Sequence, residues 1–171
     1  DNWLTAFTDK SGNYRLAEDI DMSAFSGDDH RTAAQVLYRG VTRANPFYGK
    51  LDGAGHTIRN LKLSTANSTS ESGTQTLIPY TNGAVIKDLN FENVWIENAS
   101  GATTPYAGIL GEAAGQTEIT GVYVKGIRIR NPYQYAGGIV ADLNNSTMRD
   151  CVVRDLKVEA EEKTSSLRLG G

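Results

Sequence analysis

Cysteine and histidine are almost missing from this chain. One cysteine in 171 residues excludes an internal disulfide and the common cysteine-rich zinc frameworks. A zinc peptidase needs two histidines one helical turn apart with a glutamate between them, and the only histidines, His30 and His56, stand far apart in the sequence. His30 lies in a charged segment, and His56 follows the glycine-rich turn 52–55. We therefore expect no metal, no cofactor and no catalytic role for either histidine.

An excess of charge of one sign and long apolar runs are also lacking. The formal net charge is -3, from 17 basic and 20 acidic residues that are interspersed along the chain. No basic tract suits nucleic acid or an anionic membrane, so we expect neither partner. No apolar run is long enough to cross a membrane, and the sequence opens on polar Asp1-Asn2 instead of a signal peptide. A processed or excised piece of a longer protein would have these features.

The sequence does contain a repeated spacing of apolar residues. In "VIKDLNFENVWI" (85–96) they stand three, two, three and two positions apart, whereas a helix needs threes and fours and a flat strand needs twos. The spacing recurs in "EITGVYVKGIRI" (118–129) and "TMRDCVVRDLKV" (147–158), with a shorter copy in "HTIRNLKL" (56–63). The first members are Ile58, Ile86, Ile119 and Met148, at offsets of 28, 33 and 29 residues. Such self-similarity indicates stacked structural repeats.

Each repeat predicts about three short strands. A step of two keeps side chains on one face of a strand, and a step of three marks a corner where the inward face is reset. Glycine-rich strands precede the copies: "TQTLIPYTNG" from Thr74, "YAGILGEAAG" from Tyr106 and "YAGGIVADLNN" from Tyr135. Turns are expected after them at Asn82-Gly83, Ala114-Gly115 and Asn144-Asn145.

Stacking of the repeats would build a continuous core. Coils at the ~4.8 Å spacing of paired strands would align Leu89, Val122 and Cys151 in one interior column, and Phe91, Val124 and Val153 in the next. Residues 1–171 are therefore predicted to form a single all-β domain, a right-handed parallel β-helix (a solenoid) with an irregular N-terminal segment.

The first half of the chain departs from the repeat. "NYRLAEDIDM" (13–22) alternates around Leu16, Ile20 and Met22 and predicts one strand. Ser23 to Ala44 predicts a long loop with a short helix at Arg31–Leu37. Ser64 to Gly73, "STANSTSESG", predicts a mobile Ser/Thr-rich insertion between coils.

These motifs resemble a known family. "NYRLAEDIDMS", "FYGKLDGAGHTIRNLKL", "AVIKDLNFENVWI" and the "YAGIL" and "GGIV" coils are similar to the glycine-rich β-helix repeats, often called GLUG repeats, of large bacterial surface proteins. They are closest in character to the β-helix region that precedes the catalytic domain of IgA1-specific zinc metallopeptidases in Gram-positive bacteria. The resemblance covers Asn13 to Gly171. Leu77-Ile78-Pro79 departs from it, standing where a glycine-rich strand is usual, and the zinc-peptidase helix motif is absent.

The resemblance implies a non-catalytic module of a secreted or cell-wall-attached bacterial protein. Such a module acts as a spacer, as a surface that positions substrate for a metallopeptidase domain, or as an adhesive surface. A module of this kind is not an enzyme by itself. The expected partners are a host protein or a glycan, together with the rest of a larger polypeptide.

The alternative is a carbohydrate-active enzyme, because β-helices also house polysaccharide lyases and glycoside hydrolases. The outward column Asp88, Gly121, Asp150 would place two carboxylates ~9.6 Å apart, at the wide end of the range for inverting glycosidases. Both aspartates are equally well explained as solvent-exposed residues at corners of the coil, without a catalytic role. Cys151 is expected to act as a small interior hydrophobe, because no aligned column offers it a histidine.

Trp95, Tyr123 and Tyr133 are the candidate binding residues. With Tyr106 and Tyr135 they fall near strands or corners of consecutive coils. Trp95 and Tyr123 alternate with inward-facing residues, so their side chains are expected to point outward. Exposed aromatic rings beside Asn and Arg suit sugar stacking or protein recognition. The alternative is that these rings cover corners between coils.

The chain end repeats the coil pattern. Gly137-Gly138 and Gly170-Gly171 are 33 residues apart, the same as the offset between Ile86 and Ile119. A further coil is therefore predicted to begin there. We expect the 171 residues to be a fragment of a longer polypeptide, whose next residues would be apolar.

Overall fold

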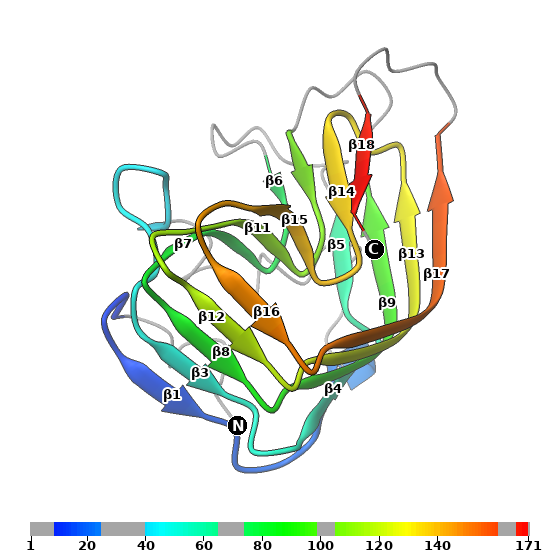
Figure 1. Ribbon diagram of the computed structural model, residues 1–171. Helices are drawn as coiled ribbons and strands as arrows, with labels where there is room; N and C mark the ends of the chain where they lie inside the picture. Colours follow the sequence, from blue (N-terminus) through cyan, green and yellow to red (C-terminus); the bar gives the residue numbers. More distant parts are fainter. Residues whose placement is uncertain (1–8, 25–39, 65–73, 99–104, 161–166, 171) are drawn as a thin grey trace.

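Short parallel strands wind into a stacked coil in the computed structural model of the protein, which describes residues 9–24, 40–64, 74–98, 105–160 and 167–170 (Figure 1). Strands make up 58% of the structure, and the parallel sheets stack as a β-solenoid of about 4 turns. The prediction of an all-β, right-handed parallel β-helix is confirmed.

Equivalent strands of successive coils pair into four parallel sheets. The five-stranded sheet contains β1 (Asn13–Arg15), β3 (Lys50–Asp52), β8 (Val85–Lys87), β12 (Glu118–Thr120) and β16 (Thr147–Arg149). The six-stranded sheet contains β2 (Ile20–Asp21), β4 (Thr57–Arg59), β5 (Lys62–Ser64), β9 (Asn90–Glu97), β13 (Tyr123–Arg130) and β17 (Val152–Glu159). The three-stranded sheet contains β7 (Ile78–Asn82), β11 (Leu110–Ala114) and β15 (Val140–Leu143). The four-stranded sheet contains β6 (Thr74–Gln75), β10 (Tyr106–Ala107), β14 (Tyr135–Gly137) and β18 (Arg168–Gly170).

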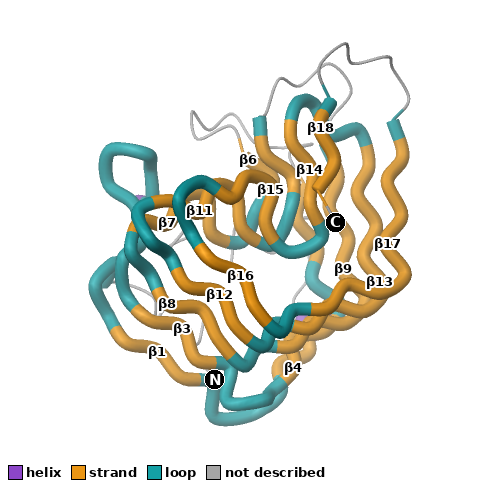
Figure 2. The backbone as a smooth tube through the Cα atoms, in the orientation of Figure 1, coloured by secondary structure: helices purple, strands orange, loops and turns teal. Residues whose placement is uncertain are grey.

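The steps of three in the sequence are corners, as predicted, and the structure adds that the residue at each corner has left-handed backbone. Figure 2 shows short turns between the stacked strands. The first corner of each repeat is formed by Asp88, Gly121 and Asp150, with φ of 50°, 65° and 53°. The second is formed by Asn93, Gly126 and Asp155, with φ of 54°, 70° and 56°. Gly, Asn and Asp tolerate positive φ best, which explains why these columns contain only those residue types.

The predicted register is confirmed in the later coils. Val124 pairs with Phe91 on one side and Val153 on the other, and Tyr106 pairs with Thr74 and Tyr135. The start of a further coil is also in the predicted register, because Gly170 pairs with Gly137. The interior side chains of the central coils are 0–2% exposed: Ile86, Leu89, Phe91, Val94, Ile96, Ile119, Val122, Val124, Ile127 and Ile129.

The register predicted for the first copy is wrong. Ile58 pairs with Phe91 and not with Ile86, whose partner is Leu51. The short copy therefore matches the second half of a repeat, so the offset of 28 residues does not correspond to one coil. An extra turn, Gly53 to His56, lies between Leu51 and Ile58. The first half of this repeat therefore lacks the spacing of three and two that marks the other repeats.

The first coil is also built differently from the prediction. Residues 13–22 do not form one strand, because β1 belongs to the five-stranded sheet and β2 to the six-stranded sheet. A 3-10 turn, η1 (Met22–Ala24), follows β2, and Leu16 and Met22 are buried. The predicted helix at Arg31–Leu37 and nearly all of the Ser/Thr-rich insertion lie outside the described residues. Within the described part of the chain, no helix is long and apolar enough to cross a membrane.

Candidate functional site

Trp95 lies on the outer face of the six-stranded sheet, half-buried by its neighbours. The Arg128 guanidinium from the next coil stacks on the indole, 4.7 Å from the ring centroid. The indole Nε1 donates a hydrogen bond to Glu97 Oε2 at 3.1 Å. Trp95 is therefore held in one orientation by groups of its own sheet, with part of its surface left to solvent.

Tyr123 lies on the outside of the same sheet but on the other side of the second corner, because Gly126 comes between Tyr123 and Arg128 in β13. It stands between Asn90 of the preceding coil and Val152 of the next, and it is half-buried. The Arg154 guanidinium lies 6.0 Å from the centroid of its ring. Trp95 and Tyr123 thus share an arrangement, in which an arginine of the next coil approaches an aromatic ring.

Tyr133 is placed differently. It follows β13 in the turn that leads to β14, and 39% of its surface is exposed. The structure therefore places two of the three predicted residues on the outside of one sheet, on opposite sides of its second corner, and the third on a turn after β13.

An ion-pair network borders Trp95 on β9, β13 and β17. Arg130 Nη1 pairs with Glu97 Oε1 at 2.9 Å. Arg128 Nε donates to Glu159 Oε2 at 2.6 Å, and Lys157 Nζ pairs with the other carboxylate oxygen at 2.7 Å. Hydrogen bonds from Arg128 and Lys157 lower the pKa of the Glu159 carboxyl to about 2. These pairs fix Arg128, which stacks on the indole, and Glu97, which accepts the hydrogen bond of the indole.

The acids considered for catalysis occupy corners. Asp88 and Asp150 are exposed residues with positive φ, and Gly121 separates them in the same column. Lys87 Nζ pairs with Asp88 Oδ2 at 2.7 Å. The corner backbone accounts for the aspartates, so nothing in this geometry calls for a catalytic role.

The other chemically reactive side chains also have local partners. His56 Nδ1 lies 3.3 Å from Asp19 Oδ1, whereas His30 lies outside the described residues. The Cys151 thiol packs against the core and donates to the Arg149 carbonyl at 3.1 Å. No group of three or more His, Cys, Asp or Glu side chains among the described residues could hold a metal ion.

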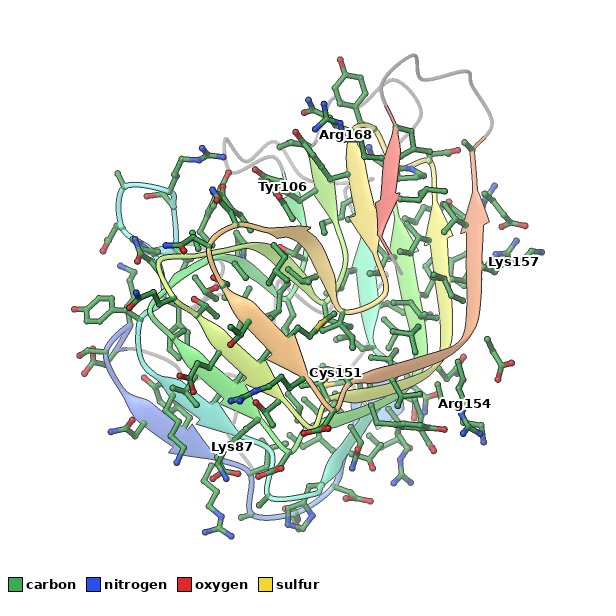
Figure 3. The ribbon with its side chains drawn as sticks, in the orientation of Figure 1. Lys87, Tyr106, Cys151, Arg154, Lys157 and Arg168 are labelled. Carbon is green, nitrogen blue, oxygen red and sulfur yellow. The ribbon has the colours of Figure 1, made fainter. Side chains whose placement is uncertain are left out.

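A polar cluster with a buried acid and a buried tyrosine lies where β10 and β11 meet, and the sequence interpretation missed it. Arg43 Nη2 pairs with Glu112 Oε2 at 2.5 Å, and the Tyr106 hydroxyl donates to the same oxygen at 3.1 Å. The Tyr106 ring packs against Tyr80 and Tyr135, with centroids 6.0 and 5.4 Å away. Figure 3 shows Tyr106 close to the junction of the four-stranded and three-stranded sheets. We call this group the Tyr106 cluster.

Charge and burial define the chemistry of the Tyr106 cluster. Tyr106 and Glu112 are 3% and 6% exposed. Burial raises the pKa of the Tyr106 hydroxyl, and the nearby Glu112 carboxylate raises it further. The same carboxylate raises the pKa of Arg43. The cluster ties the segment around Arg43 to the solenoid, and its buried acid beside a hydroxyl could also serve proton transfer.

Comparisons with protein-family models, with curated proteins and with solved structures gave no match. The family resemblance therefore rests on the repeat motifs of the sequence itself.

Proposed function

We propose that the chain is a non-catalytic β-helical module of a secreted or wall-attached bacterial protein, and that the outer face of its six-stranded sheet recognises a glycan or a host protein. The observation that carries the proposal is the pair of ring and arginine contacts on this face, Trp95 with Arg128 and Tyr123 with Arg154. Rings and guanidinium groups are the side chains that recognition surfaces favour.

The position of these side chains supports recognition. The rings and Arg128 stand on β9 and β13, whose inward neighbours, among them Val94, Val124 and Ile127, are at most 2% exposed. A surface on a packed sheet is preorganised, so little side-chain or backbone freedom is lost when a ligand binds. The same rigidity would suit a spacer or a substrate-positioning surface beside a metallopeptidase domain.

Binding arrays test the proposal. Glycan and host-protein arrays probed with the chain should give specific signals, and Trp95→Ala and Tyr123→Ala should each weaken them by about tenfold or more. Tyr48→Ala is the matched control, because Tyr48 is 55% exposed and precedes β3, away from the face. Arrays that stay blank at high protein concentration, or equal losses in Tyr48→Ala, would show that the face is not a recognition surface.

A carbohydrate-active enzyme is the second candidate, and the Tyr106 cluster is the observation that favours it. Glu112 is buried beside a tyrosine hydroxyl, and Asp142 stands opposite Glu112 on the neighbouring strand. Two carboxylates on adjacent strands suit acid and base roles on a glycosidic bond. A panel of polysaccharides with and without calcium tests this candidate: turnover that is lost in Glu112→Gln would establish it over the binding module.

A further inference from the structure

Positive charge is concentrated on β13 and β17. β13 and β17, of eight residues each, together contain five basic and two acidic residues. Their combined net charge is +3, in a chain whose net charge is -3. The remaining residues therefore carry a net charge of -6. The basic residues are Lys125, Arg128, Arg130, Arg154 and Lys157. We call this part of the outer sheet face the basic strip.

Like charges stand directly opposite each other in the basic strip. Lys125 pairs in register with Arg154 on one side and with Glu92 on the other, and Arg128 pairs with Lys157. Glu159 lies between the cations of the second pair and neutralises part of their repulsion. Lys125 and Arg154 are both exposed, and Figure 3 shows Arg154 and Lys157 extending away from the solenoid. Like charges opposite on neighbouring strands destabilise a sheet, and a bound anion would reverse that cost.

The aromatic rings of the proposed recognition face border the basic strip. Tyr123 lies beside Arg154, and Trp95 lies beneath Arg128. A ring face packs against the apolar face of a sugar, while Lys and Arg bind carboxylate and sulfate groups through charge-assisted hydrogen bonds. One surface thus offers both kinds of contact that a charged sugar needs.

We propose that the basic strip binds a linear acidic glycan, bearing carboxylate or sulfate groups, that runs along the solenoid axis across β13 and β17. Neighbouring strands are ~4.8 Å apart, which is close to the length of one sugar unit in an extended chain. Successive sugars could therefore meet the cations of successive coils. This inference rests on the recognition function proposed above and names its ligand class.

The rest of the charge distribution favours a narrow ligand. A DNA duplex or a membrane surface is broad enough to meet Glu92 and Glu97 of β9, which lie beside the strip and would repel its phosphates. A single glycan chain can stay on the strip. Glycan binding should also weaken as salt is added, because the cations are exposed.

Binding of polygalacturonate and heparin to the chain tests the inference, with dextran as the neutral glycan. The double variant Lys125→Gln/Arg154→Gln should bind the acidic glycan at least about tenfold more weakly. The control, Arg15→Gln/Lys50→Gln, removes two positive charges from the outer face of the five-stranded sheet and should retain the affinity. Thermal melts of both variants check that the fold is kept.

Each other outcome has a definite meaning. No binding of either acidic glycan, or an equal loss in the control, overturns the inference, as does equally tight binding of a DNA duplex or of phosphatidylserine vesicles. Binding of a neutral glycan or a protein that depends on Trp95, without binding of an acidic glycan, overturns this inference and leaves the recognition function standing. A chain that binds nothing on the arrays overturns both.

Discussion

The central coil, β10 to β13, and the last described coil, β14 to β17, have the same interior pattern but different burial. The five interior residues that begin at Ile119 are at most 2% exposed. Their equivalents in the last coil are only partly buried, and Leu156 is 38% exposed. The central coil is covered by strands on both sides, whereas β16 and β17 each have a described neighbour on one side only.

The difference shows that a coil does not bury its own interior. Each side chain of a solenoid core is covered by the equivalent residues of the coils above and below it. Val124 lies between Phe91 and Val153, while Val153 has Val124 on one side. The same residue type at the same position in the repeat should therefore contribute differently to the free energy of unfolding.

The largest effect is expected from a charge placed in the covered coil. Val124→Asp should lower the free energy of unfolding by at least about 4 kcal/mol, because the carboxylate would be buried without a partner. Val153→Asp, at the half-buried equivalent position, should cost clearly less. Lys125→Asp is one residue away and exposed, and should change stability by only about 0.5 kcal/mol. Urea denaturation measures all three, and equal losses for Val124→Asp and Lys125→Asp would contradict the coil register.

A smaller effect is expected when only methyl groups are removed. Val124→Ala should cost about 2 kcal/mol, from lost burial plus the cavity that the flanking coils keep open. Val153→Ala should cost about half of that, since its side chain is already partly in solvent. Urea denaturation at one temperature checks the difference. Equal costs for the two variants would mean that burial by neighbouring coils does not control the contribution of a core valine.

Sequence periodicity predicted the later coils because each contains a complete repeat. The spacing from Ile119 to Ile129 can be aligned with its neighbours in one way only, and the pairing of Val124 with Phe91 follows. The short copy at Ile58 contains one step of three and one step of two, which fits either half of a repeat. Half a repeat does not fix a register. The extra turn at Gly53 to His56 also changes the spacing between Leu51 and Ile58, so the first half of this repeat cannot be recognised in the sequence.

The candidate site was predictable where it lies on the repeat. Alternation placed Trp95 and Tyr123 on an outer face, and pairing of coils brings Arg128 and Arg154 to them. The Tyr106 cluster was not predictable, because Arg43 comes from a segment without the repeat and lies 63 residues from Tyr106 in sequence. No periodic pattern connects such residues.

The cost of backbone strain at a corner should be similar in the central and the last coil, because it depends on φ and not on cover by neighbouring coils. Corner variants therefore measure strain separately from burial. Gly121→Val should cost about 1–3 kcal/mol, because a β-branched residue strongly disfavours a φ of 65°. Asp150→Val, at the equivalent corner of the last coil, should also be destabilising, since its φ is 53°. Gly121→Asn should be mild, because Asn tolerates this conformation. Urea denaturation of these variants checks the strain, and a mild Gly121→Val would contradict the corner geometry.

The smallest effect concerns Glu159, which belongs to the less covered coil and pairs with Arg128 of the central coil. Hydrogen bonds from Arg128 and Lys157 lower its pKa from 4.5 to about 2 in the folded protein. A carboxyl with a lowered folded pKa stabilises the fold above its unfolded pKa, and the contribution disappears as pH falls through the folded pKa. Glu159→Gln should therefore melt slightly below the wild type at pH 7, and the two melting temperatures should converge between about pH 4.5 and pH 2. Because the pair is at the surface, added salt should narrow the difference at pH 7. A difference that stays constant down to about pH 2 would mean that packing of the Glu159 side chain, and not its charge, joins the two coils at this position.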